Sequence, residues 1–599
     1  MAQILDDSSR QIYSIRTVLI RQEKEMESNR GRISPDTLLP GFSDKLDFLI
    51  RNGRIFQNLG TFASASRPLL FELPSSIGKR NGMQAFDALI PGREGVPYFH
   101  TLSPFTSIRY MQGARQRAML QANFSVNPLS GWNLSAGYQR LTALRVLNVT
   151  SQDERETDHH SLWISSNFSS RNGRYRAWGH YRHLNHLQYI TGGAVPGATG
   201  FSDSIFTNPE IMKAKLFRDA RNRDLRNDWY FSQVLKLKGK WYFRSIHLRE
   251  KQLTRYGDSR PDSSYYGRDH FYFQDAGPSS GEPDSLFVQR IFEVYEHSAG
   301  IGLQDTSSSF FLFAKRRDWN FRNFFLPGSR SGADLIFGIN WDGNAGKLRH
   351  HFSLEWRDAG EYDFKGRMQW KGLVADGRFF SFRPSMVQET FQSRNLFYER
   401  NFQSSRAVQL RLSALLPMGG IRIRPRMEWM QVSSGIAFDS SFRPFQATGI
   451  SSFLYPGLDL ETNIGKRIHS ASSFTIPFQG GQRIAGMPQY ILSSSHWADL
   501  VKNRKSIAAQ IGFTIDWRAR WVSEMFAAPN AQWYVQTKEK IPSYIAFTAF
   551  SHVRIDRVRV YFRVHNVLQG LNAPGFFAAP GYPSQRRLFE LGLDWTFFD

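Results

Sequence analysis

A run of alternating apolar and polar residues constrains this 599-residue chain more than any other feature. In Arg587–Asp599 every second residue is apolar, and Glu, Gly, Asp and Thr separate the apolar residues. A period of two places the apolar side chains on one face of a β-strand and the polar side chains on the other. The stretch therefore predicts a long strand that lies between an apolar and a polar medium.

The same alternation recurs through most of the chain, for example in Leu120–Val126, Trp132–Tyr138 and Leu335–Trp341. Such strands span about nine to eleven residues, the length that a tilted strand needs to cross a membrane. Tight turns alternate with long polar loops such as Thr191–Arg226 and Tyr256–Ser285. We therefore expect an all-β fold: a single-chain antiparallel transmembrane β-barrel with long loops on one rim. At roughly 30 residues per strand, we expect about 16 strands, within a range of about 14 to 18.

The N-terminal region differs from the remainder. We interpret residues 1–40 as an N-terminal arm, periplasmic or disordered, and 41–106 as an irregular periplasmic or lumenal segment that could include a first strand at Arg54–Leu59. Residues 107–599 are expected to form the barrel. Met1–Ile4 does not start a signal peptide, so we expect the exported protein in a form from which the leader has been removed.

Composition narrows the functional classes. The chain has 76 basic and 52 acidic residues, a net charge of +24, 15% aromatic residues and no cysteine. Without cysteine, a disulfide scaffold, a thiolate metal site and a cysteine nucleophile are excluded. The basic charge suits nucleic acid, anionic lipid or anionic solutes, but the arginines are spread along the chain opposite aromatic faces. A soluble nucleic-acid-binding protein is therefore the weakest alternative.

Several short blocks resemble the β-barrel porin family of Bacteroidota outer membranes from about residue 40 onward. They are Arg51–Gly60, Ala65–Pro68, Thr101–Phe105, Tyr110–Gly113, Arg563–Leu568 and Pro580–Pro583. The C-terminal blocks are also similar to TonB-dependent receptor barrels. The resemblance implies an outer-membrane barrel of porin type and supplies no binding residues. The missing signal peptide and Asp599 after the last Phe depart from the family's pattern.

Charged residues opposite the apolar faces are expected to line the lumen. They are Arg349, Arg357, Arg367, Arg411, Arg422, Arg424, Arg426, Arg557, Arg559, Arg563, Glu355 and Glu428. A lumen lined by arginine attracts anions. The alternative is a structural ladder in which wall carboxylates neutralise the arginines. Those carboxylates would be Glu355, Asp363, Glu428, Asp516, Glu590 and Asp594.

Tryptophans recur near the ends of the apolar faces, where the aromatic girdle of a membrane protein lies. The predicted girdle residues are Trp132, Trp341, Trp356, Trp370, Trp429, Trp517 and Trp595. The acidic run Asp153–His160 could bind a divalent ion through carboxylate oxygen and imidazole, but such a run is more often a solvated loop. His180, His183 and His186 lack the spacing of a zinc site on a helix, so we expect no metal or cofactor. Motifs of hydrolases, Walker loops and zinc proteases do not occur, so we expect no enzyme.

The main functional hypothesis is an outer-membrane porin-like channel that passes small polar solutes by diffusion, with anions as one candidate class. The first alternative is the barrel of a TonB-dependent or other gated uptake receptor. Expected partners are outer-membrane lipid and lipopolysaccharide, the barrel-assembly machinery during biogenesis, and the solutes themselves, but not nucleic acid. The oligomeric state stays open.

Overall fold

The structure is a computed structural model. It describes residues 17–28, 39, 50–51, 54–90, 92–147, 154–197, 201–209, 212–216, 219–261, 263–266, 286–324, 328–358, 360–393, 396–501, 507–571 and 573–598. Among these residues every helix is short, and none has the length and apolarity needed to cross a membrane.

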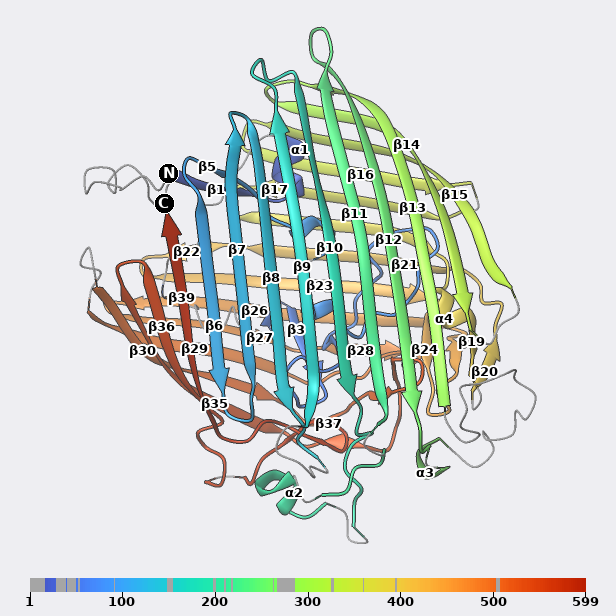
Figure 1. The fold of residues 1–599 in the computed structure, drawn as a ribbon, viewed down its shortest axis with the longest axis vertical. Helices are drawn as coiled ribbons and strands as arrows, with labels where there is room; N and C mark the ends of the chain where they lie inside the picture. Colours follow the sequence, from blue (N-terminus) through green and yellow to red (C-terminus); the bar gives the residue numbers. More distant parts are fainter. Residues whose placement is uncertain are drawn as a thin grey trace.

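Most of the described chain forms one closed antiparallel sheet (Figure 1). Its strands are β6 (Phe105–Gly113), β7 (Ala118–Leu129), β8 (Trp132–Leu144), β9 (Arg155–Ser169), β10 (Tyr175–Tyr189), β11 (Arg221–Lys236), β12 (Trp241–Asp258), β13 (Leu286–Gln304), β14 (Ser308–Asn323), β15 (Ser329–Ala345), β16 (Leu348–Arg357), β17 (Tyr362–Trp370), β18 (Leu373–Phe382), β21 (Ser405–Ala414), β22 (Leu416–Met418), β23 (Ile421–Ser433), β26 (Ile450–Ile464), β27 (Ile468–Thr475), β28 (Phe478–Gly481), β29 (Ile491–Val501), β30 (Ile507–Arg518), β35 (Tyr544–Ile555), β36 (Val558–His565) and β39 (Leu588–Phe598).

The barrel closes where β39 pairs with β6, with Phe598 opposite Phe105. Two wall positions are each built from two consecutive segments, β21 with β22 and β27 with β28. Within the described residues the wall therefore has 22 strands. The expected count of about 16 is wrong, because turns as short as 130–131 and 371–372 leave far fewer residues per strand than the estimate assumed.

The two rims of the barrel differ. Tight turns such as 346–347 join strands at the rim drawn uppermost in Figure 1. The opposite rim carries long connections such as 190–220, 383–404 and 519–543. In outer-membrane barrels the turns face the periplasm and the long loops face the exterior. The long-loop rim holds α2 (Ser204–Thr207), α3 (Ser263–Tyr266), α4 (Met386–Glu389), β19 (Thr390–Gln392), β20 (Phe397–Glu399), β24 (Ile436–Phe438), β25 (Pro444–Gln446), β31 (Trp521–Val522), β32 (Met525–Ala527), β33 (Gln532–Tyr534), β34 (Lys540–Ile541), β37 (Phe577–Ala579) and β38 (Tyr582–Pro583).

Alternation along the strands separates the two faces of the wall. Large apolar side chains such as Leu412, Leu458 and Ile511 point outward and are exposed. Residues of the opposite parity, such as Phe380 and Met430, are buried inside the barrel. The wall therefore presents an apolar outer face and an occupied interior, as the period-two pattern predicts.

The N-terminal region runs through the barrel interior (Figure 1). It contains β1 (Val18–Arg21), α1 (Glu23–Ser28), β2 (Ile50–Arg51), β3 (Arg54–Asn58), β4 (Ser66–Pro68), the 3-10 turns η4 (Asp87–Leu89) and η5 (Arg93–Gly95), and β5 (Tyr98–Thr101). A strand does occur within the expected Arg54–Leu59, but β3 pairs with β2 and β4 and not with the wall. The wall begins at Phe105, just before the boundary expected at 107.

Candidate functional site

The candidate site is the barrel lumen together with the segment that occupies it. We call the described residues of 54–104 the plug. The plug hydrogen-bonds to separate parts of the barrel. Thr157 of β9 donates to the Phe62 carbonyl at 2.9 Å, and the Ala65 N–H donates to the side chain of Gln188 in β10 at 2.8 Å. On another side, Gln57 Nε2 donates to the Ala578 carbonyl at 2.8 Å. Contacts of this kind fix the position of an irregular segment, because buried backbone groups need partners.

A buried cluster of charges holds the plug at Gly78 and Lys79. Gly78 N–H donates to Glu361 at 2.9 Å, and Lys79 N–H donates to Asp334 at 3.0 Å. The Lys79 ammonium forms an ion pair with Glu389, and Arg317 donates to the Lys79 carbonyl. Burial lowers the pKa of the Lys79 ammonium below its usual value, and the Glu389 carboxylate opposes that change. Buried ion pairs of this density make the attachment strong but intolerant of losing one partner.

Further polar contacts join the N-terminal region to β10–β12. Asp87 of the plug pairs with Arg226 at 2.7 Å, and the Tyr98 hydroxyl lies 2.7 Å from Nδ1 of His180. In α1, Glu23 is 4% exposed and contacts Tyr230. Burial raises the pKa of the Glu23 carboxyl, whereas Arg93 opposes the rise.

Apolar packing holds the plug against β15, β18, β23 and β26. Ile77 is buried with Phe380 and Met430 of the wall. The ring of Phe71 stacks on Phe453 with centroids 4.7 Å apart and planes 4° from parallel. This side of the plug depends on area removed from water and on ring stacking.

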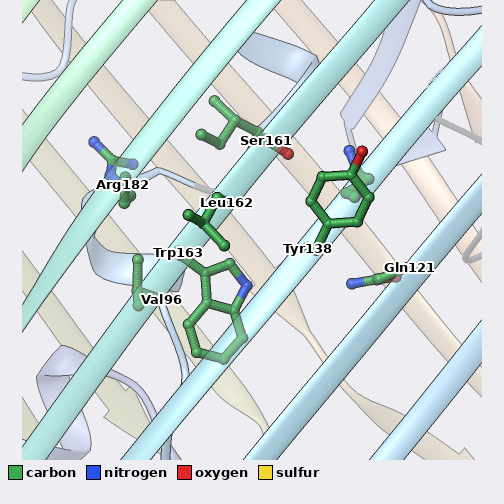
Figure 2. A pocket seen from close by; sticks show the side chains of 9 residues that line it. Val96, Gln121, Tyr138, Ser161, Leu162, Trp163 and Arg182 are labelled. Atoms are coloured by element: carbon green, nitrogen blue, oxygen red, sulfur yellow. The ribbon is translucent and has the colours of Figure 1, made fainter.

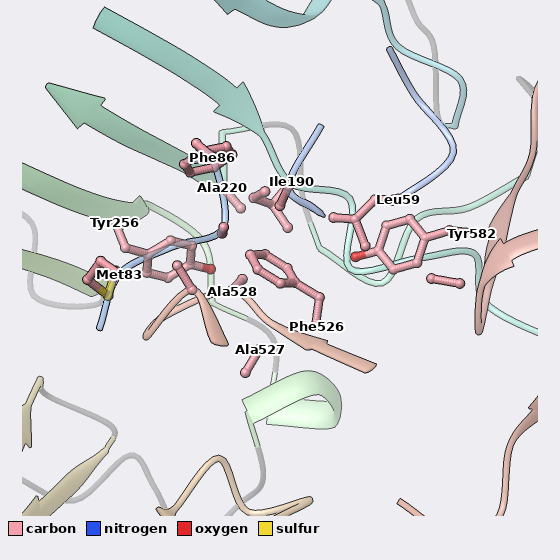
Figure 3. Packing of buried hydrophobic residues seen from close by; sticks show 14 of the residues in the cluster. Leu59, Met83, Phe86, Ile190, Ala220, Tyr256, Phe526, Ala527, Ala528 and Tyr582 are labelled. Atoms are coloured by element: carbon pink, nitrogen blue, oxygen red, sulfur yellow. The ribbon is translucent and has the colours of Figure 1, made fainter. Parts of the chain in front are cut away.

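A second apolar cluster closes the lumen near the long-loop rim (Figure 3). Leu59 and Phe86 of the plug meet Phe526 and Tyr582 from two different loops. Gly60 lies so close to the 566–587 loop that an added Cβ would sit 2.2 Å from the Pro583 carbonyl oxygen, at a φ of +86° that favours glycine. Loops and plug therefore pack as one apolar layer across the barrel.

A small pocket remains between the plug and β7–β10 (Figure 2). It is lined by Val96, Gln121, Tyr138, Trp163 and Arg182, among others, and has a volume of about 20 Å³. A single water needs roughly 10–15 Å³. The pocket can hold water, but it is far too small for a solute.

Three of the predicted lumen arginines pair with carboxylates, and of these Arg559 and Arg563 are buried and Arg357 is partly buried. Because these carboxylates lie on or beside neighbouring strands, the pairs form the ladder that the sequence left as an alternative. The pairs are Arg357 with Asp334 at 3.2 Å and Glu361 at 2.8 Å, Arg559 with Asp594 at 2.8 Å, and Arg563 with Glu590.

The other predicted lumen residues are less buried, and several of them, such as Arg349, Arg367 and Arg422, lie near the turn rim. Arg411 and Arg422 are 47% and 57% exposed, although each faces a carboxylate. The remaining placements are Arg367 with Asp376 at 3.7 Å, Arg426 with Asp459 at 3.1 Å, Glu428 with Arg411 at 3.0 Å, Glu355 with Lys315 at 3.0 Å, Arg349 and Arg424 as exposed residues, and Arg557 beside the Phe598 ring at 5.2 Å. The anion preference of this surface stays a prediction.

The predicted girdle tryptophans fall into two groups. Trp132, Trp341, Trp370 and Trp595 lie toward the turn rim and are 36–48% exposed. Trp356, Trp429 and Trp517 lie toward the long-loop rim and are partly buried. Their role at the membrane interface stays a prediction. The three histidines do not converge: His180 and His186 are buried, and His183, of the opposite parity, bonds to Asn227. Asp153 lies outside the described residues.

The sequence analysis did not single out the residues that hold the plug, such as Arg67, Lys79 and Asp334. Arg67 donates to the Gly486 carbonyl at 2.7 Å and pairs with Glu524 at 3.1 Å. The available signal was weak: charged residues occur within the Gly- and Pro-rich stretch before 107, where no solvated helix or strand explains them.

Comparison with known proteins adds to this geometry. The chain matches the model of the family described as Putative porin over residues 20–599. The siderophore receptor PirA from Acinetobacter baumannii has a similar structure, with a TM-score of 0.60, 10% identity, and coverage of 97% of this chain and 98% of that chain. The ferric yersiniabactin uptake receptor FyuA from Yersinia pestis has a TM-score of 0.57 and 10% identity, with coverage of 98% of this chain and 98% of that chain. The FrpB iron transporter from Neisseria meningitidis (F5-1 variant) has a TM-score of 0.58 and 9% identity, with coverage of 83% of this chain and 82% of that chain.

No curated protein matches the chain. At such low identity the likeness to solved structures shows the fold alone. The family match, however, spans nearly the whole sequence, and the resemblance to β-barrel porins and TonB-dependent receptor barrels is confirmed. With a closed barrel and an apolar outer wall, this chain belongs to the Putative porin family and is an outer-membrane transport barrel.

Proposed function

We propose that this protein is a gated uptake barrel, in which a small polar solute crosses the outer membrane only when the plug moves. The observation that carries the proposal is the attachment of the plug to separate parts of the wall, at Gln188, Asp334 and Phe453. Barrels of about 22 strands enclose a lumen wide enough to need a plug. An open diffusion channel, the other candidate, is favoured by the family's description.

Charge near the turn rim favours anionic solutes. Arg411 and Arg422 reach solvent there, and Arg424 is exposed on the same strand as Arg422. Because these guanidinium groups stay charged at any working pH, they would attract anions once the plug opens a path.

Conductance of the full-length protein in planar bilayers tests the gate. The chain has no cysteine, so Phe71→Cys and Phe453→Cys can be joined by a short thiol-specific crosslinker without side reactions. We expect low conductance at rest, a reversible increase when moderate urea loosens the plug, and no increase after crosslinking. The single variant Phe71→Cys is the control for the substitution.

A large, steady conductance that the crosslink leaves unchanged would show a diffusion channel beside a static plug. In that case the gated function is wrong, whereas the transport barrel stands.

A further inference from the structure

The outward charges of the barrel wall are gathered on one side. Tyr295, Trp229 and Leu312 mark the outward parity of β13, β11 and β14, because they are exposed apolar residues of the wall. The basic residues of the same parity form what we call the basic band: Arg221, Arg223, Arg249, Lys251, Arg255, Arg316 and Arg322. Among the described residues, Glu293 and Asp318 are the only acidic residues on the same outward face of β11–β14.

The opposite side of the wall is different. The outward positions of β23, β26, β30, β35 and β36 carry no charged residue in the described chain. Alternation alone does not explain this asymmetry, because both sides keep the same period of two. A charged outer face on one side therefore needs its own physical reason.

The height of the basic band on the wall supplies that reason. On β12 the outward face is uncharged from Trp241, near the turn rim, until Arg249. On β8 the corresponding stretch runs from Trp132 to Arg140. About eight residues on a strand tilted by about 40° rise roughly 20 Å, close to the ~25 Å apolar band of such barrels. The charges therefore begin where the hydrocarbon of the outer leaflet ends.

Some arginines of the basic band are neutralised by carboxylates, whereas others bond to neutral groups and remain available to bind an anion. Arg249 donates to Glu293 at 3.0 and 2.7 Å, and Arg316 pairs with Asp318 at 3.0 Å. Farther toward the long-loop rim the partners are neutral amides: Arg223 donates to Asn185 at 3.0 Å and Arg255 to Gln289 at 2.6 Å, the latter still exposed. Planar guanidinium groups with free N–H donors bind phosphate strongly.

We propose that the basic band binds the phosphate groups of an anionic glycolipid in the outer leaflet, namely lipopolysaccharide. The inference rests on the outer-membrane location of the barrel and not on movement of the plug. A second copy of the chain is the less suitable occupant, since a two-fold contact through this face would place Arg223 and Arg255 against their own copies.

Binding of defined lipids to the full-length protein in detergent tests the site. Native mass spectrometry would compare bisphosphorylated lipid A, its dephosphorylated form and phosphatidylethanolamine. We expect lipid A to bind the wild-type protein, and the other two lipids to bind at least tenfold more weakly. The triple variant Arg223→Gln/Arg255→Gln/Arg322→Gln should bind lipid A about 100-fold more weakly, because each basic residue near an anionic membrane contributes roughly fivefold.

A matched control removes three exposed cations elsewhere on the long-loop half: Arg406→Gln/Lys538→Gln/Lys540→Gln. It should bind lipid A like the wild-type protein. Equal loss in both triple variants would mean that only net charge matters and would overturn the site. Unchanged binding in the first variant, equal binding of dephosphorylated lipid A, or a dimer that the first variant abolishes would overturn it as well. Heat-modifiable migration of each variant on a gel shows whether its barrel has folded.

Discussion

Two parts of the barrel wall contact the N-terminal region through different forces. We call β11–β15 the tall half and β16–β36 the short half. In the tall half, β11–β15, the strands are 16–19 residues long, whereas β16–β18 have only 9–10. The tall half carries the basic band outside and meets the plug and α1 through charged groups such as Arg226 and Arg244 inside. The short half, β16–β36, is mainly apolar outside and packs the plug through residues such as Phe453.

Different parts of one barrel wall can therefore hold the same plug through different kinds of contact. Buried charged contacts are specific and weaken strongly when one partner loses its charge, so they suit a plug that must release. Apolar packing is non-directional and tolerates small shifts. The tall half is therefore expected to respond to charge changes, and the short half to changes of volume.

The largest effect is expected at the charge cluster around Lys79. Asp334 is 1% exposed and accepts from the Lys79 N–H, so Asp334→Ala would remove that acceptor and one of the two carboxylates that pair with Arg357 and Arg383. We expect the plug to lose about 4 kcal/mol of docking free energy. Hydrogen exchange of the plug amides measures this. Asp318→Ala on the outer face is the control, and equal protection in both variants would refute the role of the cluster.

An outward arginine distinguishes the two outer faces. Leu458 is 42% exposed on β26 of the short half, and Leu458→Arg should destabilise the barrel by about 3 kcal/mol, because hydrocarbon disfavours the charge. Ser331→Arg on β15 adds the same charge to the tall half, at the level of the basic band, and should cost under about 1 kcal/mol. Urea unfolding in bilayers compares them. Similar costs would mean that the tall half also faces hydrocarbon.

A smaller effect is expected from the apolar side of the plug. Phe71→Ala removes the ring that stacks on Phe453, and we expect a loss of about 2 kcal/mol in plug docking. Hydrogen exchange should increase around residues 69–77 and stay low around α1. Phe71→Leu, which keeps most of the apolar area, should restore about half of the loss. A uniform increase across the whole plug would contradict independent attachment of the two sides.

The smallest effect concerns pH at α1. Because burial raises the pKa of Glu23 above its usual value of 4.5, the docked state holds more protons than the released state. Docking of α1 is therefore strongest below about pH 4.5 and weakens as the pH rises through the higher pKa of the docked carboxyl. Hydrogen exchange of residues 18–28 against pH should show this slope, and Glu23→Gln should flatten it. A slope that persists in Glu23→Gln assigns it to another group.

Much of the fold could be predicted from local pattern. The alternation in Leu335–Trp341 places Phe337 outside and Ile336 inside because a strand has a strict period of two. The prediction failed where both faces of a strand are polar. The expected loop Thr191–Arg226 includes the first residues of β11, where Arg221 and Arg223 face outward and Asn222 and Asp224 inward. The same failure in the tall strands lowered the strand count.

The candidate site was less predictable. Arg559 and Arg563 could be assigned to the inner face from parity, and Asp594 and Glu590 were candidate neutralising carboxylates, but which arginine meets which carboxylate depends on the register between β36 and β39. The plug contacts of Arg67 and Lys79 join residues hundreds of positions apart. The periodicity of a single strand gives no information about such contacts.

The sequence by itself determined the chemistry of each strand face, since side-chain direction depends only on the strand's period. It also determined that the chain would form a barrel, because apolar faces of this length are stable only against lipid. Only the tertiary structure decided that the lumen is filled, which charges neutralise one another, and which side of the wall carries the basic band. These features depend on strand number, register and closure, which bring together groups that are distant along the chain.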